Sequence, residues 1–282
     1  MRWDNFRGSD NVEDRRGSRA AKGGLGIGTM IVLGFVGWYL GINPMYLISG
    51  AEMISQATTS HSESGVVGTP DDEMGRFAGK ILGNTEDVWK KVFPEQIGKT
   101  YVPTEMVLFS NATQSACGFA QAAMGPFYCP LDHKVYVDLT FFQMMKQQFG
   151  ASGDFSYAYV IAHEVGHHVE SQLGILQQVQ NRQRVVGQGE ANKLSVGVEL
   201  MADCLAGVWA HHSDAQYRSL EKGDIEEALK TAQAIGDDML QKRSQGYVVP
   251  DSFTHGTSEQ RAHWLAVGLK TGRIETCNTF AQ

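Results

Sequence analysis

An uncharged, apolar run near the N-terminus constrains this chain more than any other feature of its sequence. No charged side chain occurs from Gly23 to Ala51, and the centre of the run reads "IGTMIVLGFVGWYLGI". A membrane-spanning helix needs about 20 consecutive apolar residues, so the run predicts one transmembrane helix over residues 23–48. A cleaved signal peptide, with Ser49 and Gly50 before the cleaved bond, is the alternative, but the run is longer than the usual apolar core of such peptides.

The distribution of basic residues predicts the orientation of this helix. Lys22 precedes the run, and no further Lys or Arg follows until Arg76. The other basic residues before the run are Arg2, Arg7, Arg15, Arg16 and Arg19. Because positive charge stays on the cytoplasmic side, residues 1–22 are expected in the cytoplasm and the rest of the chain outside it. A Ser-, Thr- and Gly-rich tether over residues 49–70 then leads to a folded domain over residues 71–282.

The folded domain is expected to belong to the α+β class, mostly helical with a small antiparallel sheet. Strand-like patterns occur in "TYVPTEMVLFS" and "KVYVDL", and a helical pattern over residues 71–93 is interrupted at Gly83 and Asn84. Further helical patterns cover residues 140–150, 155–174, 195–213, 224–242 and 258–272. The net charge of −7 excludes the basic surface typical of nucleic-acid binding.

The four cysteines fit an oxidising compartment, where they could form two disulfides. Cys117 and Cys129 flank a segment with a turn signal, so a hairpin could bring them together. Cys204 with Cys277 is the second pair. For Cys204, which lies in an apolar helical stretch, a buried free thiol is the alternative.

The nonapeptide "AHEVGHHVE", residues 162–170, predicts a metal site on a helix. Positions four apart share one helix face, so His163 and His167 can bind one metal ion while Glu164 stands beside a bound water as general base. A charged, solvated helix face is the alternative. His168 points about 100° away from His167, which favours a place on the helix flank over a ligand role.

A third metal ligand is expected at Glu199, in the otherwise apolar stretch "VELMADCLAGVWA". Asp203 lies four residues later on the same helix face. Buried carboxylates need a cation or a hydrogen-bond donor, so Glu199 is expected to bind zinc and Asp203 to accept a hydrogen bond from a ligating imidazole. Two ordinary carboxylates on a surface helix are the alternative.

A residue is also needed to stabilise the oxyanion that forms when water attacks a carbonyl group. His255 is the candidate, because it lies in a loop just before the last predicted helix. An exposed loop histidine is the alternative, and His211, His212 and Tyr157 are other candidates. A peptide could add a strand near residues 135–138, although a buried strand is the simpler interpretation of that segment.

Several segments together resemble the bacterial neutral zinc metallopeptidase family. They are "RWDNFRGSDNVEDRRG", "CGFAQAAMGPFYCPLDHKVYVDLTFF", "HEVGHHVE", "ADCLAGVWA" and "HGTSEQRAHW", and "HEVGHH" with "ELMAD" follows the gluzincin pattern. Met201 stands where Gln is expected in that pattern. The resemblance implies a zincin-like peptidase with one zinc ion per chain, a protein or peptide substrate, and a catalytic domain outside the bacterial inner membrane.

Two other functions fit the same residues. A membrane-tethered binding or scaffold module would use a structural metal, or none, to hold two helices together. A zinc amidase would direct the same chemistry at cell-wall peptides. The first alternative has no use for Glu164 beside an open metal position, so that residue separates it from an enzyme.

Overall fold

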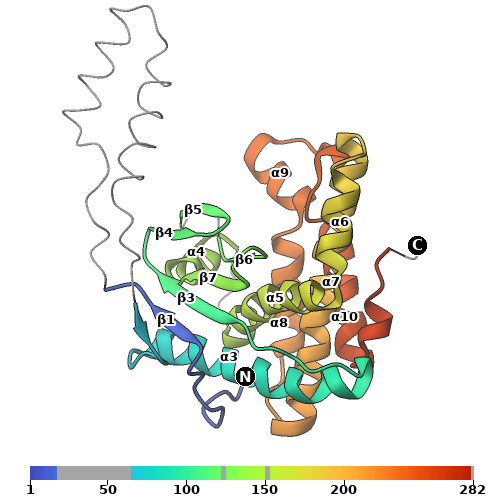
Figure 1. Ribbon diagram of the computed structural model, residues 1–282. Helices are drawn as coiled ribbons and strands as arrows, with labels where there is room; N and C mark the ends of the chain where they lie inside the picture. The colour runs from blue at the N-terminus through green and yellow to red at the C-terminus, as the bar shows by residue number, and fades with distance from the viewer. Residues whose placement is uncertain (18–64, 122–124, 150–152, 281–282) are drawn as a thin grey trace, which may run out of the picture. The chain divides into compact units, whose positions relative to one another are not determined.

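Helices dominate the computed structural model, which describes residues 1–17, 65–121, 125–149 and 153–280 (Figure 1). The described helices are α3 (Glu73–Ile97), α4 (Thr140–Phe149), α5 (Asp154–Leu173), α6 (Ile175–Gln183), α7 (Gln188–Tyr217), α8 (Asp224–Ala234), α9 (Asp237–Gln245) and α10 (Ser258–Thr271), with 3-10 turns η2 (Pro250–Ser252) and η3 (Ile274–Cys277). A small sheet accompanies them. The predicted α+β class is therefore confirmed.

The main sheet is mixed, and the prediction of an antiparallel sheet was wrong. Its strand order is β2 (Val66–Val67), β1 (Val12–Asp14), β3 (Glu105–Phe109), β7 (Lys134–Asp138) and β6 (Phe127–Cys129). β1, β3 and β7 run parallel, whereas β2 and β6 are antiparallel to their neighbours. Parallel neighbours need a long connection, because a short hairpin makes adjacent strands antiparallel. β4, β5 and β6 lie between β3 and β7 in the chain, and α3 lies between β1 and β3.

A separate hairpin joins β4 (Ala112–Ser115) to β5 (Gly118–Gln121). β7 lies between β3 and β6, so residues 135–138 cannot accept an added strand. All four of these residues are buried. The buried strand that was the simpler interpretation of this segment is therefore the one observed.

Helix α3 is continuous, whereas the sequence pattern predicted a break at Gly83 and Asn84. A Cβ atom on Gly83 would lie 2.5 Å from the backbone oxygen of Arg7. The glycine therefore allows the backbone of the N-terminal segment to lie directly against α3. Asn84 Oδ1 accepts hydrogen bonds from Trp209 Nε1 and Ser213 Oγ, both at 2.8 Å. Both residues that resemble helix breakers therefore have packing roles inside the helix.

The long helix α7 crosses α10 at very short range. A Cβ atom on Gly268 would lie 1.9 Å from Cys204 O, and one on Gly207 would lie 2.4 Å from Leu265 O. A disulfide between Cys204 and Cys277 ties α7 to the turn that follows α10, and a second joins Cys117 to Cys129. The two glycines are needed because the helix backbones are in contact.

The region predicted as one helix over residues 224–242 contains two, α8 and α9. They are separated at Gly236, where a Cβ atom would lie 2.3 Å from Ser258 N. Helix α6, which directly follows Gly174, was not predicted. Gly174 and Gly272 cap the C-terminal ends of α5 and α10, with left-handed φ values of 78° and 61°.

Within the described ranges, no helix is both long enough and apolar enough to span a membrane. The predicted span over residues 23–48 and most of the predicted tether over residues 49–70 lie outside those ranges. Both therefore remain predictions. Residues 1–14 and 66–282 form one compact unit.

The contact between α7 and α10 makes Gly268 intolerant of a side chain. Gly268→Ala is expected to lower the free energy of unfolding by about 1–3 kcal/mol, because its methyl group must push two backbones apart. Urea denaturation followed by circular dichroism measures this change. Gly189→Ala in the first turn of α7 is the control, since a Cβ atom there has no neighbour within 4 Å. Equal stability of the two variants would contradict the close crossing.

Candidate metal centre

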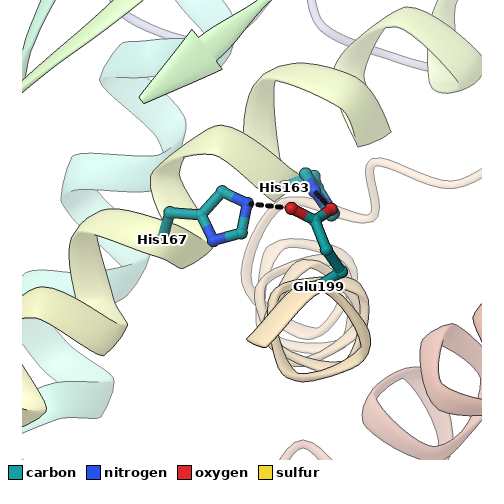
Figure 2. A group of neighbouring side chains, drawn as sticks. All are labelled: His163, His167 and Glu199. Atoms are coloured by element: carbon teal, nitrogen blue, oxygen red, sulfur yellow. Dashed lines mark hydrogen bonds and ion pairs between the residues drawn. The ribbon is translucent and has the colours of Figure 1, made fainter. Parts of the chain in front are cut away.

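Three side chains from two helices direct their donor atoms toward one point. His163 and His167 lie one turn apart on α5, and the carboxylate of Glu199 on α7 lies between their rings (Figure 2). Glu199 Oε2 is 3.2 Å from His163 Nε2, and Glu199 Oε1 is 3.6 Å from His167 Nε2. One ligand atom from each residue lies within 4.8 Å of the others. Two imidazoles and one carboxylate are the protein ligands of many catalytic zinc sites.

A glycine within the motif allows the two helices to meet at this point. A Cβ atom on Gly166 would lie 3.0 Å from Ala202 O, so α5 and α7 touch at Gly166 and Ala202. Ala202 stands between Glu199 and Asp203 in the sequence. The close contact therefore places both carboxylates of α7 opposite the imidazoles of α5.

A buried carboxylate holds the remaining nitrogen of each imidazole. His163 Nδ1 is 2.8 Å from Asp203 Oδ1, and His167 Nδ1 is 2.8 Å from Glu170 Oε2. Asp203 and Glu170 are both fully buried. With the Nδ1 proton donated to the carboxylate, each ring is held with Nε2 directed toward Glu199, and Nε2 can bind a metal ion once it is deprotonated. The contact to Asp203 is the one expected from the sequence, whereas the role of Glu170 was missed.

Asp203 is itself held by two further buried side chains. Arg261 on α10 donates from Nε to Asp203 Oδ2 at 2.8 Å and from Nη2 to Asp203 Oδ1 at 3.0 Å. The Tyr159 hydroxyl donates to Asp203 Oδ1 at 2.5 Å. A forked contact of this kind fixes the plane of the carboxylate as well as its position. Arg261 thus acts on His163 through Asp203.

The charges of this cluster fit a bound cation. Glu164, Glu170, Glu199 and Asp203 surround the two imidazoles, and Arg261 supplies one positive charge. Burial disfavours a charged imidazole, but Asp203 and Glu199 outweigh it and raise the pKa of His163 to about 10. The metal-free cluster therefore takes up protons to offset its carboxylates. A divalent metal ion would provide the same positive charge.

Glu164 lies next to His163 on α5 and is nearly buried, with 7% of its surface exposed. Burial raises its pKa above the ordinary carboxyl value, and charge on His163 and His167 opposes this shift. A raised pKa brings a carboxylate closer to the neutral range in which a general base exchanges protons. The buried position of Glu164 and its raised pKa therefore suit the general-base role expected from the sequence.

His255 lies in the loop between η2 and α10, where Asp237 fixes it. Asp237 Oδ2 accepts the backbone N–H groups of Thr254, His255 and Gly256 at 2.8, 2.7 and 3.1 Å. The hydrogen bond from the imidazole to Asp237 Oδ1 raises the pKa of His255, burial opposes this, and Glu199 adds to the rise. The His255 ring is thus within electrostatic reach of Glu199, with half of the side chain exposed.

His168 lies away from the three donors, as its helical position predicts. Its Nδ1 is 3.1 Å from the Tyr128 hydroxyl, and its Nε2 is 2.7 Å from Val102 O. Burial lowers the pKa of His168 to about 4, so the ring is neutral. His168 therefore joins α5 to β6 and to the segment that precedes β3.

The other candidates for the oxyanion role have structural partners elsewhere. His211 Nδ1 is bonded to Leu269 O at 2.9 Å, and His212 Nε2 to Gly272 O at 2.8 Å, both at the end of α10. The Tyr157 ring stacks on Phe142 in the core. The structure does not bring these three residues to the metal centre.

Sequence reasoning missed Glu170, Arg261 and Tyr159. A local signal existed for Glu170, which lies three residues after His167 and so shares its helix face. Tyr159 lies four residues before His163 and carried a similar signal. Arg261 carried none, because its approach to Asp203 depends on how α10 crosses α7.

The forked contact of Arg261 predicts a loss of metal affinity when its geometry is changed. Arg261→Lys keeps the charge but removes the fork, so His163 loses orientation and zinc affinity should fall by about 10- to 100-fold. Competition with a chromophoric chelator measures this affinity. Arg273→Lys is the control, because Arg273 forms an exposed ion pair with Glu275. Unchanged affinity in Arg261→Lys would show that Asp203 does not need the fork.

The sequence of this chain is similar to a described protein family and to several other bacterial proteins. The chain matches a family model described as "Putative neutral zinc metallopeptidase" over residues 1–280. It is 47% identical to the "Uncharacterized protein YpfJ" of Escherichia coli K12 over 100% of this chain and 99% of that protein. It is 41% identical to the "Uncharacterized protein Rv2575" of Mycobacterium tuberculosis over 71% of this chain and 68% of that protein. No solved structure matches. The chain belongs to the neutral zinc metallopeptidase family.

Proposed function

We propose that this protein is a zinc-dependent peptidase that hydrolyses peptide bonds. The observation that carries the proposal is the convergence of His163, His167 and Glu199 on one point, with Glu164 beside them. Membership of a zinc metallopeptidase family supports the reaction class. The substrate class, a protein or peptide, follows from the family and is part of the proposal.

His163, His167 and Glu199 would hold the zinc ion, and the donor chemistry supports this choice. Imidazole nitrogens and one carboxylate suit zinc, and three protein ligands leave a position for water and substrate. Both imidazoles are already oriented by Asp203 and Glu170. A bound zinc ion would polarise the peptide carbonyl group and lower the pKa of a water molecule.

The protein's own side chains handle the protons. Glu164 accepts a proton from the attacking water and delivers it to the leaving amine, which its raised pKa favours. His255 donates a hydrogen bond to the oxyanion that forms from the carbonyl oxygen. Asp237 raises the pKa of the His255 imidazole and holds its loop in place.

We also propose that residues 23–48 attach the peptidase to the bacterial inner membrane. The uncharged run of the sequence supports this location. The two disulfides favour an oxidising compartment, outside the cytoplasm, for the catalytic domain. Residues 49–65 would connect this membrane-attached segment to the folded unit.

Metal content tests the assignment of the ligands. Wild-type protein should bind about one zinc ion per chain, and Glu199→Ala and His167→Ala should lose most of it, because each removes one of three protein ligands. Elemental analysis after dialysis measures the ratio. His263→Ala on α10 is the control, since His263 lies outside the cluster. Full zinc retention in Glu199→Ala would move the third ligand elsewhere.

Glu164 separates an enzyme from a scaffold. Glu164→Gln should bind zinc normally but lower kcat/KM by about 10²- to 10⁴-fold, because the amide cannot take up the proton. Hydrolysis of a fluorescent casein, a short peptide and a cell-wall fragment, compared side by side, measures the effect and identifies the bond. Wild-type rates in Glu164→Gln would contradict the mechanism. Zinc binding with no hydrolysis of any of the three would favour the scaffold, and cleavage of the wall fragment alone would favour the amidase.

A further inference from the structure

The first 14 residues belong to the folded unit that contains the metal centre. β1 lies inside the main sheet, where Val12 pairs with Met106 of β3 and Glu13 pairs with Val67 of β2. Val12 is 1% exposed, and Phe6 is 4% exposed. Burial of this kind makes the N-terminal segment an integral part of the core.

Polar contacts anchor the same segment at its beginning. The N-terminal amine of Met1 is 3.3 Å from both Glu221 Oε2 and Asp224 Oδ1. The Arg2 backbone N–H donates to Ser219 O at 2.8 Å, and Trp3 Nε1 donates to Asp154 Oδ2 at 2.8 Å. These contacts reach α5, α8 and the loop before α8.

A second anchor surrounds Glu86 of α3, which is 2% exposed. Its carboxylate accepts hydrogen bonds from Ser9 Oγ at 2.5 Å and from Asn11 Nδ2 at 2.8 Å, and it pairs with Arg7 Nη2 at 2.5 Å. The absence of a side chain at Gly83 lets the Arg7 backbone lie against α3. A buried carboxylate without these partners would be costly, so α3 depends on the N-terminal segment.

The predicted membrane span lies between two strands that are neighbours in the sheet. Asp14 at the end of β1 pairs with Val66 at the start of β2. The chain therefore leaves the folded unit and returns to it at one place, whatever the path of residues 18–64. An odd number of membrane crossings in between would separate β1 from β2 and β3.

We infer that residues 1–14 and the catalytic domain lie on the same side of the membrane, so that residues 23–48 attach to the membrane without a single crossing of it. The sequence predicted that residues 1–22 lie in the cytoplasm and the catalytic domain outside it. Our inference replaces that prediction. The charge argument for that placement weakens because two of its arginines, Arg2 and Arg7, have partners in the fold. Arg7 pairs with Glu86 and Asp87, and Arg2 with Glu221. A membrane-attached enzyme of this kind encloses its N-terminus within the catalytic unit.

Accessibility of single cysteines tests the inference in the full-length protein. Asn5→Cys and Lys222→Cys each introduce a thiol at an exposed position, one in the N-terminal segment and one before α8. A membrane-impermeant maleimide is applied to intact and to lysed cells, with the wild type as background. We expect both sites to react in intact cells, or both only after lysis, because the two segments share one side. Reaction of one site in intact cells and of the other only after lysis would overturn the inference.

A cross-link tests the pairing of β1 independently of any membrane. Glu13→Cys with Val67→Cys joins directly opposed residues, so a disulfide should form in most molecules and appear as a linked peptide by mass spectrometry. Glu13→Cys with Val66→Cys is the matched control, since adjacent strand residues point to opposite faces. Equal yields in the two pairs would overturn the docking of β1. If the chain forms the Glu13–Val67 disulfide but is soluble, the docking of β1 holds and only the proposed membrane attachment is contradicted.

Discussion

The contact between α5 and α7 at Gly166 and Ala202 is the constraint on which the metal centre depends. A Cβ atom at Gly166 would lie 3.0 Å from Ala202 O, so a side chain there would press against α7 beside Glu199, whose carboxylate lies between the two imidazoles. The same approach buries Asp203 against His163. The glycine in the middle of the histidine motif is therefore part of the site, although it has no side chain to bind anything.

Electrostatic balance explains the residues around this contact. Buried carboxylates are stable only with donors or cations nearby, and here Arg261 and Tyr159 serve Asp203 while His167 serves Glu170. Each carboxylate orients the group that stabilises it. These hydrogen bonds orient both imidazoles in the absence of a metal ion or substrate.

Local patterns in the sequence predicted the parts of the site that lie within single helices. The spacing of His163, Glu164 and His167 defines one helix face, and carboxylates at Glu199 and Asp203 stand out in an apolar stretch. Tertiary contacts determined what was missed. The partner of Asp203 comes from α10, and β1 is three residues long and pairs with a strand about ninety positions away. The glycine in α3 resembled a helix break because its neighbour, the Arg7 backbone, is distant in sequence.

The position of β1 also affects the order in which the chain can assemble. The N-terminal segment is made first, yet its partners follow in β3 and then in residues 221 and 224, far along the chain. Closing loops of this length is slow, because the entropy cost precedes the gain in contacts. Residues 1–14 can meet Glu86 once α3 has been made, but they complete their contacts only after β3 and then residues 221 and 224 have followed.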